Sequence, residues 1–220
     1  MTLLASWVSI DSRRPAAIYI MSDSRISCGN TAKFDFARKV FACKNSTDNF
    51  RYCGDLLFPS IVLGQLVDII DLGVLLKPAA TCEQKFEIVF SELVRLFKVY
   101  PKNAGITSDA LEIIHACRDP NQNFFARKMR WEKHTGLWKA SSVTFDDYSN
   151  KLFIAGSGAR EFNEKFKGYL LSENKKTSRA LFHCFWDTLK NIKDRYCGGA
   201  PQMVVRYCRQ IGLNQSAYRG

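Results

Sequence analysis

Short apolar runs separated by turn residues dominate the N-terminal part of the chain. Residues 3–10 (LLASWVSI) and 16–22 (AAIYIMS) flank the turn signal DSRRP, and residues 39–44 (KVFACK) and 50–53 (FRYC) flank the polar stretch NSTDN. Runs of this length, bounded by turn residues, are typical of β-strands. The pattern therefore predicts two successive β-hairpins.

Further along the chain, the apolar pattern changes to helical spacing and back. Residues 56–76 and 82–100 carry apolar residues at helical spacing, and Pro101 ends the second segment. Strand patterns then return, followed by two more helical segments and a last strand. We expect these strands at 110–118, 123–133, 136–145 and 151–158, helices at 159–172 and 178–194, and a strand at 203–208.

The order of these elements predicts the fold class. No Ser/Gly-rich linker, repeat or low-complexity segment divides the chain, so we expect residues 1–220 to form a single domain. Two stacked antiparallel sheets with a helix pair on each outer face would bury all the apolar faces. The sequence thus predicts an α+β protein with a four-layer αββα sandwich.

The segment 56–76 is apolar on most sides, which is more than one buried helix face needs. Such a helix must be covered on most sides, and a sheet covers only one. The cover is either another subunit or the helix expected at 82–100. We favour the first and expect this helix at a contact between subunits of a homo-oligomer of at least six copies.

Composition narrows the location and the chemistry. No apolar run approaches the length of a membrane span, and the start MTLLASWVSIDSRR lacks the basic leader of a signal peptide, so we expect a cytoplasmic protein. The eight cysteines include no CxxC pair, and the three histidines share no motif, so neither a metal site nor a disulfide framework is indicated. We expect no cofactor.

The formal net charge of +11 raises the question of an acidic partner. The basic residues are spread along the chain, with no basic tail and no nucleic-acid-binding motif. A solvated basic surface is therefore favoured, nucleic acid is an unlikely partner, and a face that docks an acidic protein is the alternative.

Several short motifs follow one another in a specific order. SDSR contains Asp23, and Lys39 lies sixteen positions later; RYCGD contains Gly54; LFIAGSG contains Ser157; and DRYCGG (194–199) precedes the last strand. Each motif alone is weak, but together and in this order they form a specific signal. With them the chain resembles the proteasome superfamily of N-terminal nucleophile hydrolases, and within it most closely the bacterial HslV-type peptidases.

The resemblance implies an N-terminal threonine peptidase in which Thr2 is the nucleophile once the initiator methionine is removed. A threonine hydroxyl needs a base, and a free α-amino group has an unperturbed pKa of about 7.7–8.0, so one residue would supply both. Lys39 would lower the pKa of that amine and favour the alkoxide, and Asp23 would hold Lys39 in place. The Gly54 amide would stabilise the oxyanion.

Other positions are assigned by the same resemblance. Ser157, Asp194 and Cys197 would support the amine, although Cys197 stands where the family has serine and donates a weaker hydrogen bond. Ile26, Ala37 and Tyr52 would line the pocket for the substrate side chain, which their apolar character predicts to be uncharged and apolar. The substrates would be peptides or unfolded proteins. Subunits would form a ring or a related assembly, fed by an ATP-dependent unfoldase.

Taken singly, these residues also have ordinary interpretations. Thr2 can be only a start residue, Asp23 a turn former, Lys39 a solvated lysine and Gly54 a turn glycine. Asp55 would put a negative charge near the oxyanion. Two other function classes therefore stay open: a proteasome-like scaffold or binding subunit without activity, and an N-terminal nucleophile amidase that acts on a small molecule.

Overall fold

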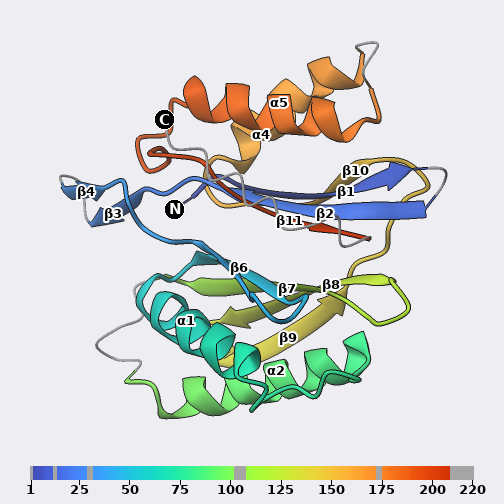
Figure 1. Ribbon diagram of the computed structural model, residues 1–220. Coiled ribbons are helices and arrows are strands. Elements are labelled where there is room, and N and C mark those ends of the chain that lie inside the picture. The colour runs from blue at the N-terminus through green and yellow to red at the C-terminus, as the bar shows by residue number, and fades with distance from the viewer. Residues whose placement is uncertain (1, 12–13, 29–31, 102–107, 172–174, 209–220) are drawn as a thin grey trace.

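Two antiparallel β-sheets lie face to face in the computed structural model, and a pair of helices covers the outer face of each sheet (Figure 1). The structure describes residues 2–11, 14–28, 32–101, 108–171 and 175–208. The layers therefore follow the order helices, sheet, sheet, helices. This is the four-layer α+β sandwich that the sequence predicts, and the prediction is confirmed.

The first sheet carries the N-terminal strands. Its strand order is β10-β1-β2-β11, with all neighbours antiparallel. The strands are β1 (Leu4–Asp11), β2 (Arg14–Ser22), β10 (Asn150–Ala155) and β11 (Gln202–Tyr207). Strand β1 lies in the middle of this sheet, where both of its faces are buried.

The second sheet has five antiparallel strands in the order β5-β6-β7-β8-β9. The strands are β5 (Val40–Ala42), β6 (Asn49–Gly54), β7 (Ala110–Arg118), β8 (Phe124–Glu132) and β9 (Leu137–Ser142). A separate two-stranded hairpin, β3 (Ile26–Cys28) and β4 (Ala32–Phe34), projects from one end of the sandwich (Figure 1). The sequence pattern did not predict this hairpin, because its three-residue strands carry no alternating apolar pattern.

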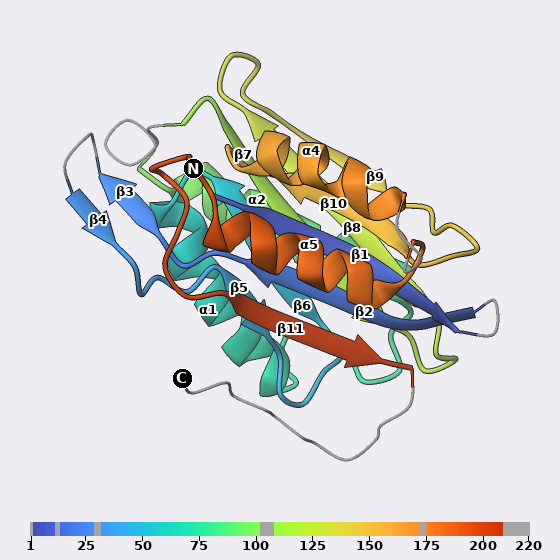
Figure 2. The same ribbon diagram turned by 90° about the horizontal axis from the view of Figure 1, so that it is seen from above.

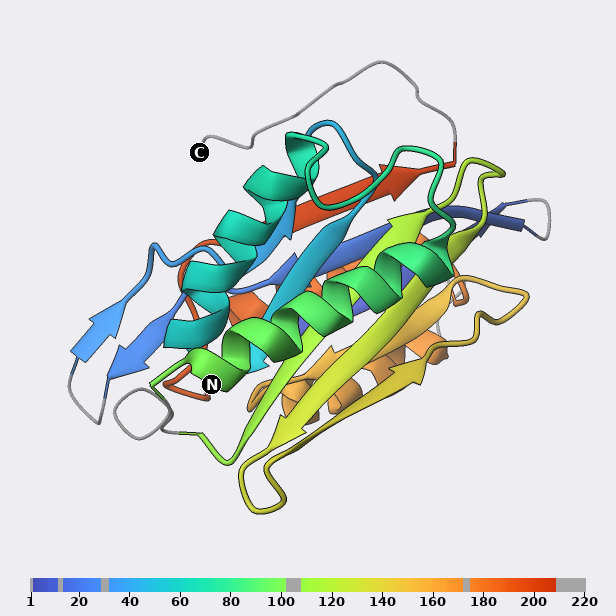
Figure 3. The same cartoon turned by 90° about the horizontal axis from the view of Figure 1, so that it is seen from below.

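Each helix pair covers one sheet. Helices α4 (Ala159–Leu170) and α5 (Ser178–Lys190) lie over the first sheet (Figure 2), and α1 (Leu57–Asp71) and α2 (Cys82–Val99) lie under the second (Figure 3). Helix α2 begins with a capping box, in which the Thr81 side chain and the Gln84 side chain each bind the other residue's backbone N–H. None of the helices in the described part of the chain combines the length and the apolar character that a membrane crossing requires.

Alternation along the strands divides the core into three layers. In β1, Ala5 and Trp7 pack towards α4 and α5, while Val8 faces the second sheet. The second sheet packs on α1 and α2 through a separate cluster that includes Phe50, Tyr52, Leu63 and Val89. Successive side chains of β1 therefore face alternately the helices and the space between the two sheets.

The apolar segment 56–76 differs from the prediction. The helix ends at Asp71, because Gly73 adopts a left-handed φ of 70° and the chain turns there. Its buried face, which includes Val62, Leu66 and Ile70, packs in the cluster shared with α2 and the second sheet. The cover thus comes from the second sheet and from α2 of the same chain, and Leu57 and Ile61 remain as half-exposed apolar side chains on the helix.

Candidate active site around Thr2

Thr2 precedes strand β1 and is buried, with 3% of its surface exposed. Thr2 lies an even number of positions before Ser6 and Val8, and side chains at such spacing point to the same face of a strand. Its side chain therefore faces the second sheet, as that of Val8 does, and not the helices. In the pairing of β1 with β2, Leu4 lies opposite Ser22. The next position along β2 is Asp23, and the register therefore places this carboxylate beside Thr2.

Asp23 is fully buried, and its two carboxylate oxygens accept several hydrogen bonds. Oδ1 accepts from Thr2 Oγ1 at 2.8 Å, from the Leu3 N–H at 3.0 Å and from Lys39 Nζ at 2.8 Å. Oδ2 accepts from the N–H groups of Gly198 at 3.0 Å and Arg25 at 3.3 Å. A buried carboxylate is tolerated only when it is paired and hydrogen-bonded in this way.

Lys39 enters the same site from the segment that leads into β5. Its ammonium donates to Thr2 Oγ1 and forms a buried ion pair with Asp23. The Lys39 backbone N–H donates to the side-chain oxygen of Gln202 on β11 at 2.9 Å, which fixes the segment against the first sheet. Burial lowers the pKa of the Lys39 ammonium, and the Asp23 carboxylate works in the opposite direction.

The arrangement has a definite chemical sense. Asp23 accepts a hydrogen bond from the Thr2 hydroxyl, and the Lys39 ammonium donates a hydrogen bond to the same hydroxyl oxygen. A positive charge against the hydroxyl oxygen stabilises negative charge that develops there. The three side chains that the sequence motifs single out therefore form one buried cluster around a hydroxyl.

The Gly-Ser-Gly turn at 156–158 packs directly on the Thr2 backbone. The Gly158 N–H donates to the Thr2 carbonyl at 3.2 Å. Gly156 has a φ of 87°, and a Cβ atom there would lie 2.0 Å from the Thr2 carbonyl oxygen. Only glycine allows this approach, so the turn fixes the position of Thr2.

Ser157, Asp194 and Cys197 form a second cluster beside this turn. The Cys197 sulfur lies 3.5 Å from the Ser157 hydroxyl and 3.5 Å from Asp194 Oδ2. Burial raises the pKa of the Cys197 thiol to about 12, so the thiol is neutral. Burial would also raise the pKa of Asp194, but hydrogen bonds from Ser157, the Tyr196 N–H and Cys197 outweigh it and lower that pKa.

Gly54 ends strand β6, opposite Leu111 of β7, with a φ of 96°. A Cβ atom there would lie 2.2 Å from the Ala110 carbonyl oxygen, so this position requires glycine. The next residue, Asp55, is buried. Burial raises the pKa of Tyr52, and the charges of Asp23 and then Asp55 add to this shift.

The three expected pocket residues are only partly open. Ala37 and Tyr52 are buried, and Ile26 is half-buried at the start of the β3–β4 hairpin. The Tyr52 hydroxyl donates to the Arg38 carbonyl at 3.5 Å, and its ring packs 6.3 Å from that of Phe41. Tyr52 thus belongs to the core under the second sheet as well as to the segment that carries Lys39.

Sequence reasoning missed one residue that organises the site. Arg25 belongs to the SDSR motif, but no role was assigned to it. Its guanidinium binds Asp35 through two hydrogen bonds of 2.6 and 2.8 Å and the Cys197 carbonyl through one of 2.9 Å. Gly198 lies against it, since a Cβ there would be 2.5 Å from Arg25 Cζ. In the sequence, Arg25 is noticeable only because it follows Asp23 by two positions in the SDSR motif. That position does not indicate which residues its side chain binds.

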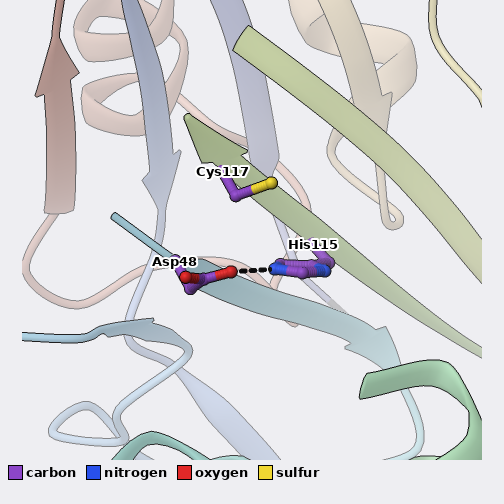
Figure 4. Close-up of side chains that lie close together, drawn as sticks. All are labelled: Asp48, His115 and Cys117. Atoms are coloured by element: carbon purple, nitrogen blue, oxygen red, sulfur yellow. Dashed lines mark hydrogen bonds and ion pairs between the residues drawn. The ribbon is translucent and has the colours of Figure 1, made fainter. Parts of the chain in front are cut away.

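One other cluster in the described part of the chain brings metal-ligating side chains together. Asp48, His115 and Cys117 have ligand atoms within 4.8 Å of one another (Figure 4). His115 Nε2 binds Asp48 Oδ1 at 2.6 Å, and the Lys85 ammonium binds Asp48 Oδ2 at 3.1 Å. A hydrogen bond with Cys82 and burial raise the pKa of the Cys117 thiol. The carboxylate is already paired with a cation and the thiol is protonated, so the cluster fits a buried ion network rather than a metal centre.

Comparison with known proteins is informative only at the level of structure. No protein-family model matches the chain, and no curated protein matches it significantly. The structure of Thiobacillus denitrificans BPH in complex with epoxomicin matches with a TM-score of 0.58 and 14% identity, over 94% of this chain and 99% of that one. Eukaryotic HslV from Trypanosoma brucei matches with a TM-score of 0.53 and 11% identity, over 94% and 99%.

A third similar structure is the helical assembly of the Anbu complex from Pseudomonas aeruginosa. Its chain matches with a TM-score of 0.63 and 14% identity, over 93% of this chain and 81% of that one. At such identities the matches establish the fold, which is that of the proteasome β-like N-terminal nucleophile hydrolases. The family resemblance seen in the sequence motifs is therefore confirmed at the level of the fold.

Proposed function

We propose that the chain is an N-terminal threonine peptidase that cleaves peptide bonds through an acyl-enzyme. The observation that carries the proposal is the buried contact of the Thr2 hydroxyl with both the Lys39 ammonium and the Asp23 carboxylate. A hydroxyl held between a fixed cation and a fixed carboxylate is well suited to act as a nucleophile.

The first step requires removal of Met1, because the Thr2 nitrogen is otherwise an amide and cannot accept a proton. The freed amine accepts the hydroxyl proton as Thr2 Oγ1 attacks the substrate carbonyl carbon. Lys39 stabilises the developing negative charge on Oγ1 and keeps the amine neutral by repulsion. Asp23 keeps Lys39 charged despite burial, and Ser157, Asp194 and Cys197 support the amine.

The second step resolves the tetrahedral intermediate. The Gly54 N–H holds its oxyanion, and such a donor is typically worth ~3–4 kcal/mol. The protonated amine gives its proton to the departing amine of the substrate, which leaves an ester on Thr2 Oγ1. A water molecule, deprotonated by the same amine, hydrolyses the ester and restores the hydroxyl.

The substrates in this proposal are peptides or unfolded proteins, with Ile26, Ala37 and Tyr52 around the side chain that precedes the cleaved bond. An apolar lining favours an uncharged apolar side chain there. The proposal places the enzyme in the cytoplasm as a single domain in a ring or related assembly, served by an ATP-dependent unfoldase. It assigns no cofactor.

A second candidate is a proteasome-like subunit that no longer cleaves. The observations that favour it are the buried Asp55 next to Gly54 and the neutral Cys197 thiol in the place of a hydroxyl. Both would weaken catalysis without disturbing the fold.

The experiment combines an intact-mass measurement with a variant. We expect purified protein to lack Met1, to hydrolyse fluorogenic peptides and to be labelled by epoxomicin on Thr2. Thr2→Ala is expected to abolish hydrolysis and leave assembly unchanged, because it removes only the nucleophilic hydroxyl and one methyl group. Thr144→Ala, at an exposed position, is the matched control and is expected to retain full activity. Full activity in Thr2→Ala would refute the enzyme, and a retained Met1 with no hydrolysis would favour the non-cleaving subunit.

A further inference from the structure

A cavity of about 410 Å³ opens between the two sheets, apart from the Thr2 hydroxyl. Strands β6, β7 and β8 contribute Arg51, Glu112 and Lys128 to one wall. The opposite wall is apolar and consists of residues 152–155 of β10 with the start of α4. Nothing in the proposed peptidase mechanism uses this cavity, although its rim includes Gly156, which packs on Thr2.

Arg51 is the unusual residue in this wall. Its side chain is 1% exposed, and its Nε and Nη2 groups have no hydrogen-bond partner within the described structure. The Phe153 ring lies over the guanidinium, 5.4 Å from its carbon atom. An unpaired buried cation is costly, and native proteins avoid it unless an anion completes the site.

The unpaired edge of Arg51 has a defined preference. Nε and Nη2 form the edge that binds carboxylates through two parallel hydrogen bonds. The same edge binds Asp35 from Arg25 and Glu92 from Arg95 in this molecule. Burial lowers the pKa of Arg51 to about 9, so the guanidinium keeps its charge at neutral pH.

The carboxylate of the cavity, Glu112, raises the pKa of Arg51 by its charge but does not bind the Nε and Nη2 groups. Glu112 Oε1 is bound by the Arg130 guanidinium at 2.5 Å, and its Oε2 accepts from the Cys53 thiol at 3.7 Å. Lys128 adds a further positive charge to the same wall. Two cations, Arg51 and Lys128, face a single carboxylate, Glu112, in this wall, so the cavity favours an anion.

We propose that this cavity binds a small ligand that carries one carboxylate and an apolar group. The carboxylate pairs with Arg51 and Lys128, and the apolar group packs against Leu152 and Phe153, the two β10 side chains that lie between the sheets. A phosphate dianion is less suited, because Glu112 would repel its second negative charge. The volume matches a ligand of amino-acid to dipeptide size. This site is separate from the peptidase proposal and does not depend on it.

The test is calorimetric titration of the wild-type protein with N-acetyl-L-leucine and with 4-methylpentanoate at pH 7. The uncharged amides of the two acids are the control ligands. We expect the acids to bind at least about tenfold more tightly than the amides, which corresponds to one charge-assisted contact. Methyl NMR signals of Leu152 are expected to shift on addition of the acids, whereas those of Ile154, which packs on the helix side of β10, are not.

Variants locate the site. Arg51→Gln is expected to abolish binding of the acids, and Lys128→Gln to weaken it about fivefold; if Arg51→Gln fails to fold, Lys128→Gln decides. Lys167→Gln, which makes the same charge change on the exposed side of α4, is expected to bind like the wild type. Equal affinity for acid and amide, no binding of either acid at millimolar concentration, or an unchanged affinity in Lys128→Gln would overturn the proposal.

Discussion

The Lys39 ammonium is almost fully buried, and one carboxylate, that of Asp23, balances its charge. Burial of such a pair costs free energy that hydrophobic side chains of the same size would not cost. The pair is therefore expected to serve chemistry more than stability. The ammonium also contacts the Thr2 hydroxyl, which is the group that the proposed reaction activates.

Lys39→Arg tests whether the ammonium is placed for catalysis. The larger planar guanidinium cannot occupy the same space without moving Thr2 or Asp23. We expect peptide hydrolysis to fall by roughly 10³-fold, comparable to the loss of one oxyanion donor. Asp23 keeps its bonds to the N–H groups of Leu3 and Gly198, so the protein should still fold. Lys44→Arg, at an exposed position, is the control, and near-wild-type activity in Lys39→Arg would show that Lys39 has no catalytic role.

Gly156 and Gly136 form a matched pair for a test of packing against Thr2. Both have positive φ, 87° and 68°, but a Cβ at Gly136 meets nothing within 4 Å, whereas one at Gly156 meets the Thr2 carbonyl. Gly136→Ala is expected to cost about 1–2 kcal/mol, which reflects the backbone conformation alone. Gly156→Ala is expected to cost more and to abolish hydrolysis, as measured by urea unfolding and peptide assay. Equal costs would mean that the turn does not clamp Thr2.

Among the elements, the sandwich strands and helices were predictable and the hairpin β3–β4 was not. Period-two runs such as 16–22 and helical spacing such as 82–100 report directly which faces are buried. The strands of this hairpin bury few side chains, and their residues do not alternate between apolar and polar. The end of α1 was missed for a related reason: Leu76 is buried after the helix ends, and an apolar turn looks like more helix in the sequence.

The site was predictable only through the family resemblance. In the sequence, Asp23 directly follows one strand and Lys39 directly precedes another, and neither position indicates that the two side chains are in contact. The ion pair between them depends on the register of β1 with β2 and on the path of the chain into the second sheet. Arg25 stayed hidden because its partners Asp35 and Cys197 come from two separate segments.

Arg25 ties the β3–β4 hairpin to the 194–199 turn, and Arg25→Lys tests that connection. Lysine keeps the charge but cannot bind Asp35 through two bonds and the Cys197 carbonyl at once. We expect faster hydrogen exchange of the Gly198 N–H, which binds Asp23, and about tenfold lower hydrolysis. Arg95→Lys is the control, because it removes a similar two-bond pair on the exposed surface of α2. Unchanged exchange at Gly198 would show that the turn is held by other contacts.

At the scale of the whole molecule, some apolar side chains remain exposed on the surface and are candidates for contacts between subunits. Most of helix α1 is covered within the chain, which removes part of the sequence argument for a subunit contact. Leu57 and Ile61 lie one helical turn apart and expose 49% and 53% of their surfaces, and Phe34 and Phe36 on or next to β4 expose 55% and 83%. Exposed apolar side chains that gather in this way mark contact sites more often than chance.

We still expect a homo-oligomer of at least six subunits, with the exposed edge of α1 in a contact. Under the proposed function, a peptidase that works on unfolded chains needs its sites enclosed. Light scattering should give a mass of at least six times 25.1 kDa for the wild type. The double variant Leu57→Glu, Ile61→Glu should shift the mass towards the monomer, because two buried charges in an apolar contact are costly. Leu171→Glu, at an exposed apolar position on the opposite helix layer, is the control and should leave the mass unchanged.

A wild-type monomer at micromolar concentration would refute the assembly. An oligomer that the double variant leaves intact would move the contact elsewhere, and the Phe34 and Phe36 hairpin would be the next surface to change.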